Sequence, residues 1–141
     1  MATRSKHLEH LAAIPLFSSL SKRDLQRIAK SSNEVTRPAG TKLVDQGDLG
    51  REAFIIIEGT ATVRRNNRKV GVVGPGDAVG ELSLLDHGPR TASVVADTEI
   101  TVLVLSAREF TGVIEEVPGL AHKLLGQLAG RVRQLDRQIY G

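Results

Sequence analysis

The spacing of hydrophobic residues changes twice along the chain, from helical to strand-like and back to helical. Near the start, Leu25 and Ile28 lie one helical turn apart, and Ser21 with Asp24 three residues on forms a capping pair that begins a helix. The middle has short β-branched runs between turn residues. A chain of 141 residues is long enough for one domain with its own core. We therefore expect a single domain with N-terminal helices over 1–32, a β-rich part over 33–105 and C-terminal helices over 106–141.

The β-rich part is expected to contain about eight short strands. Ala53 to Ile57 is a continuous apolar run of strand length, whereas residues 60–65 alternate as a half-exposed strand does. Asn66-Asn67 marks a hairpin, because asparagine tolerates a positive φ. The pattern predicts a mainly β protein, an antiparallel sandwich or barrel of jelly-roll type, and we expect an eight-stranded antiparallel jelly roll (a double-stranded β-helix) with N-terminal helices and a long C-terminal helix.

The last predicted helix, over about 119–139, carries one apolar stripe. Its members recur at alternating steps of four and three residues, which is the spacing of a coiled-coil seam, although the stripe falls short of three heptads. Two interpretations remain open: the stripe joins two copies into a homodimer, or it packs over the β-rich part of its own chain. The stripe consists of Ala121, Leu125, Leu128, Val132, Leu135 and Ile139.

Composition and charge exclude several classes of function. Hydrophobic residues make up 40% and charged residues 25% of the chain, which fits an ordinary globular protein, and a net charge of +3 is too small to demand a nucleic-acid partner. The absence of cysteine excludes disulfides and thiolate chemistry. Because no apolar run reaches the length of a membrane span, we expect a cytoplasmic protein. The four histidines lie in different predicted elements without ligand spacing, so we expect no metal site.

Residues 80–93 have the clearest chemistry: a glycine and an acid, a short apolar turn, and an arginine that follows Gly88-Pro89. Unpaired N–H groups at the start of a short helix attract an anion, and a guanidinium adds two parallel charge-assisted hydrogen bonds. The carboxylate of Glu81 would repel a phosphate but accepts a hydrogen bond from a sugar hydroxyl. Gly80, Glu81 and Arg90 together therefore predict a site for a phosphorylated sugar.

This stretch resembles the phosphate-binding cassette of cyclic nucleotide-binding domains, which occur in cAMP-dependent kinase regulatory subunits, catabolite activator proteins and cyclic nucleotide-gated channels. The family pattern is roughly Gly-Glu-Leu/Ile-Ala/Ser-Leu, a short gap, and Pro-Arg-Thr/Ala-Ala-Ser/Thr-Val. Pro15-Leu-Phe17, Gly59 and Pro75-Gly-Asp77 extend the resemblance over nearly the whole chain, while Val79 replaces an aromatic residue common before the glycine. The matching cassette residues are Gly80, Glu81, Leu82, Ser83, Leu84, Pro89, Arg90, Thr91, Ala92, Ser93 and Val94.

The resemblance implies a role for each cassette residue. Arg90 would clamp the cyclic phosphate, Glu81 would bind the ribose hydroxyl, and Leu82 and Ser83 would direct main-chain N–H groups at the phosphate. Thr91 would offer its hydroxyl to the phosphate or to a guanine edge, and it leaves the base open because cAMP- and cGMP-responsive members both have a threonine here. The implied ligand is cAMP, with cGMP less favoured, and no other cofactor is implied. The ligand-binding residues are thus expected to be Gly80, Glu81, Leu82, Ser83, Arg90 and Thr91.

The resemblance also implies how binding would be transmitted. The family domain is a sensor and not an enzyme, and its last helix closes over the base when the cassette moves toward the ligand. In this chain Leu84 or Leu85 would then repack against Phe110. The candidate base contacts on the last helix are Leu128, Arg131, Leu135 and Asp136.

Two hypotheses from other classes stand beside the sensor. A structural or dimerisation module would keep the fold without binding a ligand, and the apolar stripe supports it. A cupin-like metalloenzyme would use the jelly roll for a metal site, against which the scattered histidines argue. No helix-turn-helix, kinase or channel segment follows the last helix in this sequence, so we expect no DNA binding by this chain and leave its effector unassigned.

Overall fold

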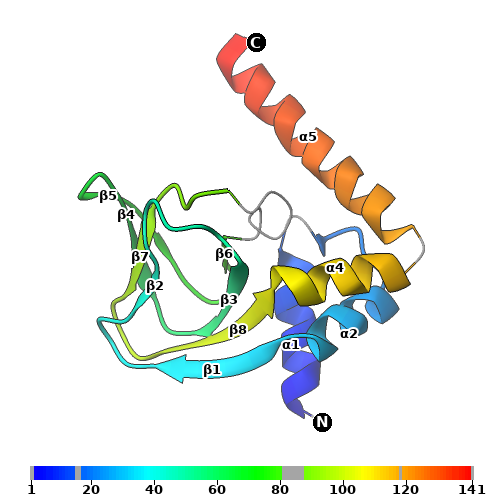
Figure 1. Cartoon of the computed structure of the whole chain (residues 1–141), viewed down its shortest axis with the longest axis horizontal. Coiled ribbons are helices and arrows are strands. Elements are labelled where there is room, and N and C mark those ends of the chain that lie inside the picture. Colours follow the sequence, from blue (N-terminus) through cyan, green and yellow to red (C-terminus); the bar gives the residue numbers. More distant parts are fainter. Residues whose placement is uncertain (1, 15–16, 81–87, 118, 141) are drawn as a thin grey trace.

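The computed structural model describes residues 2–14, 17–80, 88–117 and 119–140, and it has two antiparallel sheets with helices at one side (Figure 1). The predicted mainly β jelly roll with flanking helices is confirmed, with eight strands in these residues. The helices are α1 (Ala2–Ala13), α2 (Lys22–Lys30), α4 (Ala107–Glu116) and α5 (Leu120–Tyr140). The strands are β1 (Asn33–Arg37), β2 (Lys42–Val44), β3 (Glu52–Glu58), β4 (Ala61–Arg65), β5 (Arg68–Val73), β6 (Ala78–Val79), β7 (Ser93–Ala96) and β8 (Ile100–Ser106).

The order of strands in each sheet differs from their order along the chain. One sheet has the order β1-β8-β3-β6 and the other β2-β7-β4-β5, and the pairings within both are antiparallel. Strands that follow one another in sequence therefore often lie in different sheets, as in a jelly roll. The connections from β2 to β3 and from β6 to β7 both cross between the sheets, and they carry the residues of the candidate site.

The two central strands of the first sheet, β3 and β8, separate two hydrophobic clusters. Alternate side chains of a strand point to opposite faces, so Ile55 packs toward the helices and Ile56 packs between the sheets. The helix-side cluster includes Phe17 and Phe110, whose ring centroids lie 5.9 Å apart. The helices are thus fixed to the roll through the outer face of one sheet.

Local signals read from the sequence are confirmed. The Ser21 hydroxyl accepts a hydrogen bond from the Asp24 N–H at 3.1 Å, and the Asp24 carboxylate accepts one from the Ser21 N–H at 3.3 Å, which is the reciprocal cap that begins α2. Ser106 caps α4. Asn66 and Asn67 have φ of 53° and 64° and turn the chain between β4 and β5.

A buried carboxylate connects α2 to α5. Lys123 Nζ donates to Asp24 Oδ2 at 2.9 Å, and Asp24 is only 7% exposed. The hydrogen bond from Lys123 lowers the pKa of Asp24 below its usual 3.8, with the Ser21 hydrogen bonds acting in the same direction and burial opposing them. The folded protein therefore favours the ionised carboxylate, which fixes the first turn of α5 on the N-terminal helices.

Replacing Asp24 with asparagine is expected to lower the free energy of unfolding at neutral pH by about 1–2 kcal/mol, because asparagine still caps α2 but gives Lys123 no charge. A lowered folded-state pKa contributes stability above the unfolded pKa, and this contribution is lost as the pH falls through the folded value. Urea unfolding of parent and D24N at several pH values should therefore converge as the pH falls from 3.8 through the lowered pKa. If the difference in unfolding free energy between parent and D24N persisted in acid, the loss would come from the helix cap and not from the charge of Asp24.

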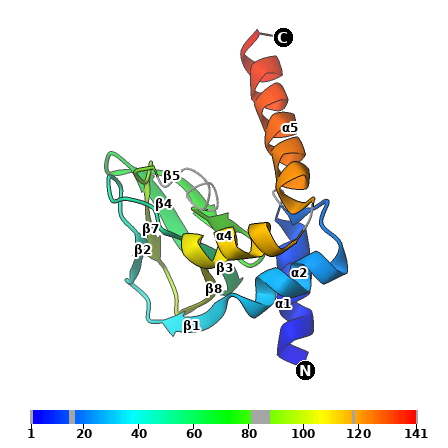
Figure 2. The same ribbon diagram turned by 45° about the vertical axis from the view of Figure 1, so that its right-hand side comes forward.

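Helix α5 leaves the rest of the molecule after its first turns. Leu120 and Leu124 are buried in the helix-side cluster and Leu128 packs against it, but beyond them the helix points away from the sheets in both views (Figures 1 and 2). The interpretation that the apolar stripe packs over the β-rich part is therefore wrong in this structure. The exposed large side chains of the stripe are Leu125 (65%), Val132 (64%), Leu135 (58%) and Ile139 (70%).

Candidate functional site

Gly80 and Arg90, which are ten residues apart, lie in contact where the connection between β6 and β7 begins and ends. Arg90 Nη1 donates to the Gly80 carbonyl at 3.5 Å, and Arg90 Nη2 donates to the Glu52 carbonyl at 2.6 Å. These two main-chain carbonyls orient the guanidinium at the start of β3. A guanidinium held in a defined plane can present paired N–H groups to an anion.

The backbone at Gly80 leaves no room for a side chain. Its φ is +74°, in the left-handed region that favours glycine. A Cβ at this position would overlap Arg90 Nη1 and would lie 3.0 Å from Cζ and 3.3 Å from the Glu52 carbonyl oxygen. A side chain at this position would therefore have to displace the Arg90 guanidinium, in addition to adopting an unfavourable backbone conformation.

Replacing Gly80 with alanine is expected to lower stability by about 1–2 kcal/mol through the left-handed backbone and to displace the guanidinium. A displacement on the order of 1 Å should weaken the binding of a phosphate-bearing ligand by about 10- to 100-fold. Gly76→Ala is the matched control, because Gly76 also has a positive φ of +90° but an added Cβ would meet nothing within 4 Å. Thermal unfolding should show a similar loss of stability in both variants. Ligand titration should show a loss of affinity in Gly80→Ala alone.

The electrostatic surroundings of Arg90 are mixed. Burial of the guanidinium lowers the pKa of Arg90 below its usual value, and the carboxylates of Glu52 and Asp48 act against that shift. Arginine stays cationic in proteins, so the effect of burial is a charge with less water around it. Such a charge attracts an anion more strongly, while the two acids compete with that anion.

The turn between β2 and β3 holds the segment that carries Arg90. The Gly47 N–H donates to the Arg90 carbonyl at 2.9 Å, and the Arg90 N–H donates to the Asp48 carbonyl at 2.6 Å. The Gly50 N–H also donates to the Gly88 carbonyl at 3.0 Å. This strip of main-chain hydrogen bonds fixes the backbone on both sides of the arginine, and the side chain therefore leaves from a defined point.

A cavity of about 420 Å³ borders Arg90 on the side of this turn. Its volume lies in the range of small-molecule sites. Apolar side chains from β2 and β3, including Leu43 and Phe54, line it together with charged groups of both signs. The charged lining consists of Lys42, Arg51 and Arg90 with Asp45, Asp48 and Glu52.

The structure brings together two of the predicted ligand-binding residues, Gly80 and Arg90. Thr91 is exposed beside them, and its carbonyl accepts a hydrogen bond from Arg65 Nε at 3.1 Å. The predicted short helix and its residues Glu81, Leu82, Ser83, Leu84 and Leu85 lie outside the described residues.

The structure does not bring the predicted base contacts on α5 to Arg90. Leu128 is half-buried against the helix-side cluster, whereas Leu135 and Asp136 are exposed on the part of α5 that points away from the sheets. The side chain of Arg131 is outside the described residues. Closure of α5 over a base therefore stays a prediction.

The described ranges lack two further kinds of feature. No cluster of three or more histidine, aspartate or glutamate side chains there could hold a metal ion. None of the helices in those ranges combines the length and the hydropathy needed to cross a membrane.

Sequence reasoning missed the partners that hold Arg90. The turn residues within 46–50 predict only a turn, and the sequence gives Glu52 no role. No spacing rule predicts that a turn pairs with a segment about forty residues later, because that pairing follows from the crossing of two connections between the sheets. The one local signal was the cluster of Gly47, Asp48 and Gly50, which marks tight backbone but not its partner.

Comparisons with known proteins give similarities of sequence and of fold. The family model described as "Cyclic nucleotide-binding domain" matches residues 34–117. The chain is 32% identical over 130 residues to the cyclic AMP receptor protein of Thermus thermophilus, covering 89% of this chain and 60% of that protein. It is 34% identical over 147 residues to a cAMP-dependent protein kinase regulatory subunit of Mycosarcoma maydis, covering 98% of this chain but only 26% of that protein.

A solved structure is similar over almost its whole length. The N-terminal domain of a transcriptional regulator from Streptomyces coelicolor superposes with a TM-score of 0.85 at 33% identity, covering 91% of this chain and 95% of that one. The chain therefore matches one part of longer regulators and nearly all of a separately solved regulator domain.

Proposed function

This chain belongs to the cyclic nucleotide-binding domain family, and from that premise we propose that it is a regulatory sensor and not an enzyme. The observation that carries the proposal is the contact of the Arg90 guanidinium with the left-handed backbone of Gly80. By the family pattern, Arg90 would bind the cyclic phosphate together with the N–H groups of Leu82 and Ser83, and Glu81 would bind the ribose hydroxyl. Thr91 would add a hydroxyl at the edge of the same site.

We favour cAMP over cGMP as the ligand, with no further cofactor. The two relatives described above are both named for cAMP. Thr91 is compatible with either base, because its hydroxyl can bind phosphate or a guanine edge.

Calorimetric titration with cAMP, cGMP and linear AMP tests this function. We expect the tightest binding with cAMP and the weakest with AMP, whose phosphate lacks the ring. At a cAMP concentration 100 times the dissociation constant, stability should rise by about 2.7 kcal/mol and be visible as an upward shift of the unfolding temperature. No heat and no thermal shift at millimolar cAMP or cGMP would contradict the sensor and favour a structural module.

We further propose that binding is transmitted through α5. The first turn of this helix is tied to Asp24 and to the cluster that contains Phe110, so a change in that cluster would move the whole helix. A ligand shifts such an equilibrium only by its different affinity for the two arrangements. Hydrogen exchange along α5 with and without cAMP should therefore differ, and identical exchange would contradict the coupling.

The exposed stripe on α5 favours a second role in dimerisation, which is compatible with sensing. Leu125, Val132, Leu135 and Ile139 expose apolar surface at the heptad spacing that a second copy of the helix could bury. A structural module without ligand would use the same surface, so the titration above separates the two.

Replacing Leu135 with glutamate is expected to raise the dimer dissociation constant by at least about 100-fold, because two buried leucines would become charges in one interface. Sedimentation velocity over a concentration series measures it. Gln134→Glu is the matched control, since it changes the charge of the neighbouring exposed position outside the stripe. A parent that remains monomeric at high concentration would contradict the dimer.

A further inference from the structure

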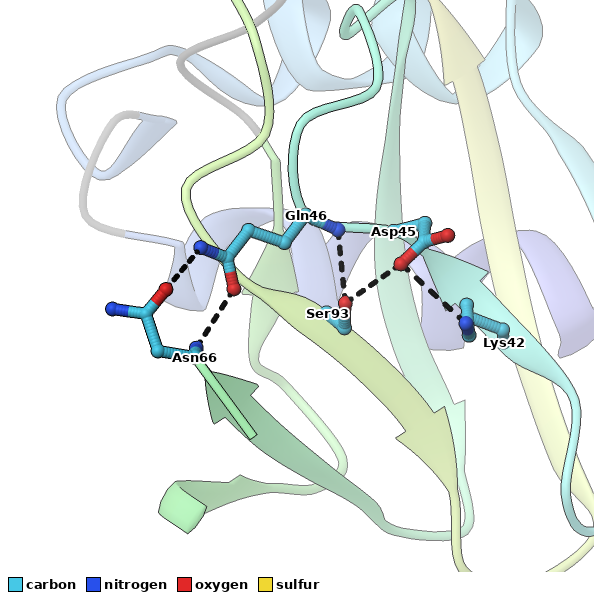
Figure 3. Close-up of polar contacts among 5 residues, drawn as sticks. All are labelled: Lys42, Asp45, Gln46, Asn66 and Ser93. Atoms are coloured by element: carbon cyan, nitrogen blue, oxygen red, sulfur yellow. Dashed lines mark hydrogen bonds and ion pairs between the residues drawn. The ribbon is translucent and has the colours of Figure 1, made fainter. Parts of the chain in front are cut away.

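The tip of the β4–β5 hairpin is tied to the turn after β2 by two hydrogen bonds between one pair of residues (Figure 3). Gln46 Nε2 donates to Asn66 Oδ1 at 2.9 Å, and the Asn66 N–H donates to Gln46 Oε1 at 2.9 Å. Asn66 is held at a φ of 53°, a left-handed conformation that presents its N–H and side chain on the same side. A paired contact of this kind fixes both the position and the orientation of the turn.

A second set of bonds ties the same turn to the start of β7. The Gln46 N–H donates to Ser93 Oγ at 2.9 Å, and Ser93 Oγ donates to Asp45 Oδ1 at 2.9 Å (Figure 3). Lys42 Nζ lies 3.4 Å from the same carboxylate oxygen. Ser93 therefore satisfies a donor and an acceptor of the turn at once, three residues after Arg90.

These contacts lead directly to the main chain of Arg90. The turn that Gln46 orients goes on to exchange main-chain hydrogen bonds with Arg90, through the Gly47 N–H and the Asp48 carbonyl. The turn thus holds the main chain of Arg90 by hydrogen bonds, and Ser93 ties the segment that follows Arg90 to the same turn. The hairpin tip, the turn and the arginine form one continuous chain of hydrogen bonds.

We propose that Gln46 and Asn66 are positioning residues of the nucleotide site, which hold the turn against the hairpin tip and thereby place the Arg90 guanidinium for the phosphate. The proposal rests on the function proposed above. A binding group acts at full strength only when the residues behind it keep it within a fraction of an ångström of its productive place. Because Gln46 and Asn66 are exposed and their side chains hydrogen-bond to each other, neither is expected to touch the ligand.

Gln46→Ala removes both side-chain bonds to Asn66, and we expect it to weaken cAMP binding by roughly two- to tenfold, the range of one or two hydrogen bonds. Thr62→Ala is the matched control: the Thr62 hydroxyl makes exposed bonds to Asp97 at 2.9 and 2.8 Å on the same sheet, away from the turn. It should leave the affinity within twofold. Gln46→Glu should restore part of the affinity, because its carboxylate still accepts from the Asn66 N–H and can accept from Asn66 Nδ2 once the Asn66 amide turns over.

Amide hydrogen exchange without ligand distinguishes positioning from a general loss of stability. The Arg90 N–H, bonded to Asp48, should exchange faster in Gln46→Ala, while the Ile56 N–H, bonded to the Asp77 carbonyl at 2.9 Å, should exchange as in the parent. Unchanged affinity in Gln46→Ala, equal acceleration at both amides, or no recovery with Gln46→Glu would overturn the inference alone. A parent that binds neither cAMP nor cGMP would overturn the proposed function and this inference together.

Discussion

Replacing Arg90 with alanine is expected to weaken cAMP binding by about 2–5 kcal/mol, the cost of removing one partner from a hydrogen-bonded charge pair that the bound ligand would bury. The guanidinium is half-buried and is held by the carbonyls of Gly80 and Glu52, so little of its orientation has to be arranged when the phosphate arrives. Loss of the side chain removes the charge and leaves those two carbonyls without this donor. Calorimetric titration with cAMP measures the change in affinity.

Two further variants test whether the loss of affinity is specific to the Arg90 guanidinium. Arg108→Ala removes the same charge from an exposed position on α4 and should leave the affinity almost unchanged, because exposed charges at a distance are screened by salt. Arg90→Lys keeps the charge but not the planar fork, and we expect it to bind more weakly than the parent and more tightly than Arg90→Ala. Equal affinity of parent and Arg90→Ala would show that the phosphate lies elsewhere.

The features of the fold that the sequence predicted correctly are those decided within a few residues. The reciprocal cap of Ser21 and Asp24 and the left-handed pair Asn66-Asn67 depend on neighbours in the chain, and both are confirmed. The strand pairing is different in kind: β3 pairs with β8, whose residues are more than forty positions away. A continuous apolar run predicts that such a strand is buried, but it does not predict which strand pairs with its edge.

The candidate site also combines contacts that the sequence could predict with contacts that it could not. Gly80 and Arg90 belong to one motif, and their contact could be expected from it. The carbonyl of Glu52 could not, because a main-chain acceptor leaves no mark in the sequence and any residue type could supply it. The sequence also contains no signal for the pairing of the turn after β2 with the Arg90 segment, although this pairing holds the arginine.

Helix α5 illustrates a third case, in which the sequence pattern is clear and its partner is not. The stripe is apolar in either interpretation, since a coiled-coil seam and a core-facing helix share the same spacing. Leu120 and Leu124 are buried, Leu128 is half-buried and the stripe beyond Leu128 is exposed, so the structure assigns the two ends of one helix to different surroundings. A helix anchored at one end can report a small movement of its base as a large movement of its tip.

The anchor of that helix is the cluster around Phe110, and Phe110→Ala is expected to lower the free energy of unfolding by about 3–5 kcal/mol. The side chain is fully buried and its ring lies against Phe17 with centroids 5.9 Å apart, so truncation removes aromatic contact area and leaves a cavity beneath the helices. For a chain of this length the unfolding temperature should fall by roughly 10–15 °C. Differential scanning calorimetry measures the shift.

Glu115→Ala is the matched control for Phe110→Ala. Glu115 lies on the exposed face of α4, the helix that contains Phe110, and its replacement should change the free energy of unfolding by less than about 0.5 kcal/mol. If Phe110 also transmits binding, as the predicted repacking of Leu84 or Leu85 requires, then the conservative variant Phe110→Leu should fold and bind cAMP but lose the change in α5 hydrogen exchange. A Phe110→Leu protein that retains the full exchange response would separate the two roles. Phe110 would then only stabilise the helix-side cluster, and binding would be transmitted to α5 by another contact, for which the Asp24–Lys123 hydrogen bond is the candidate.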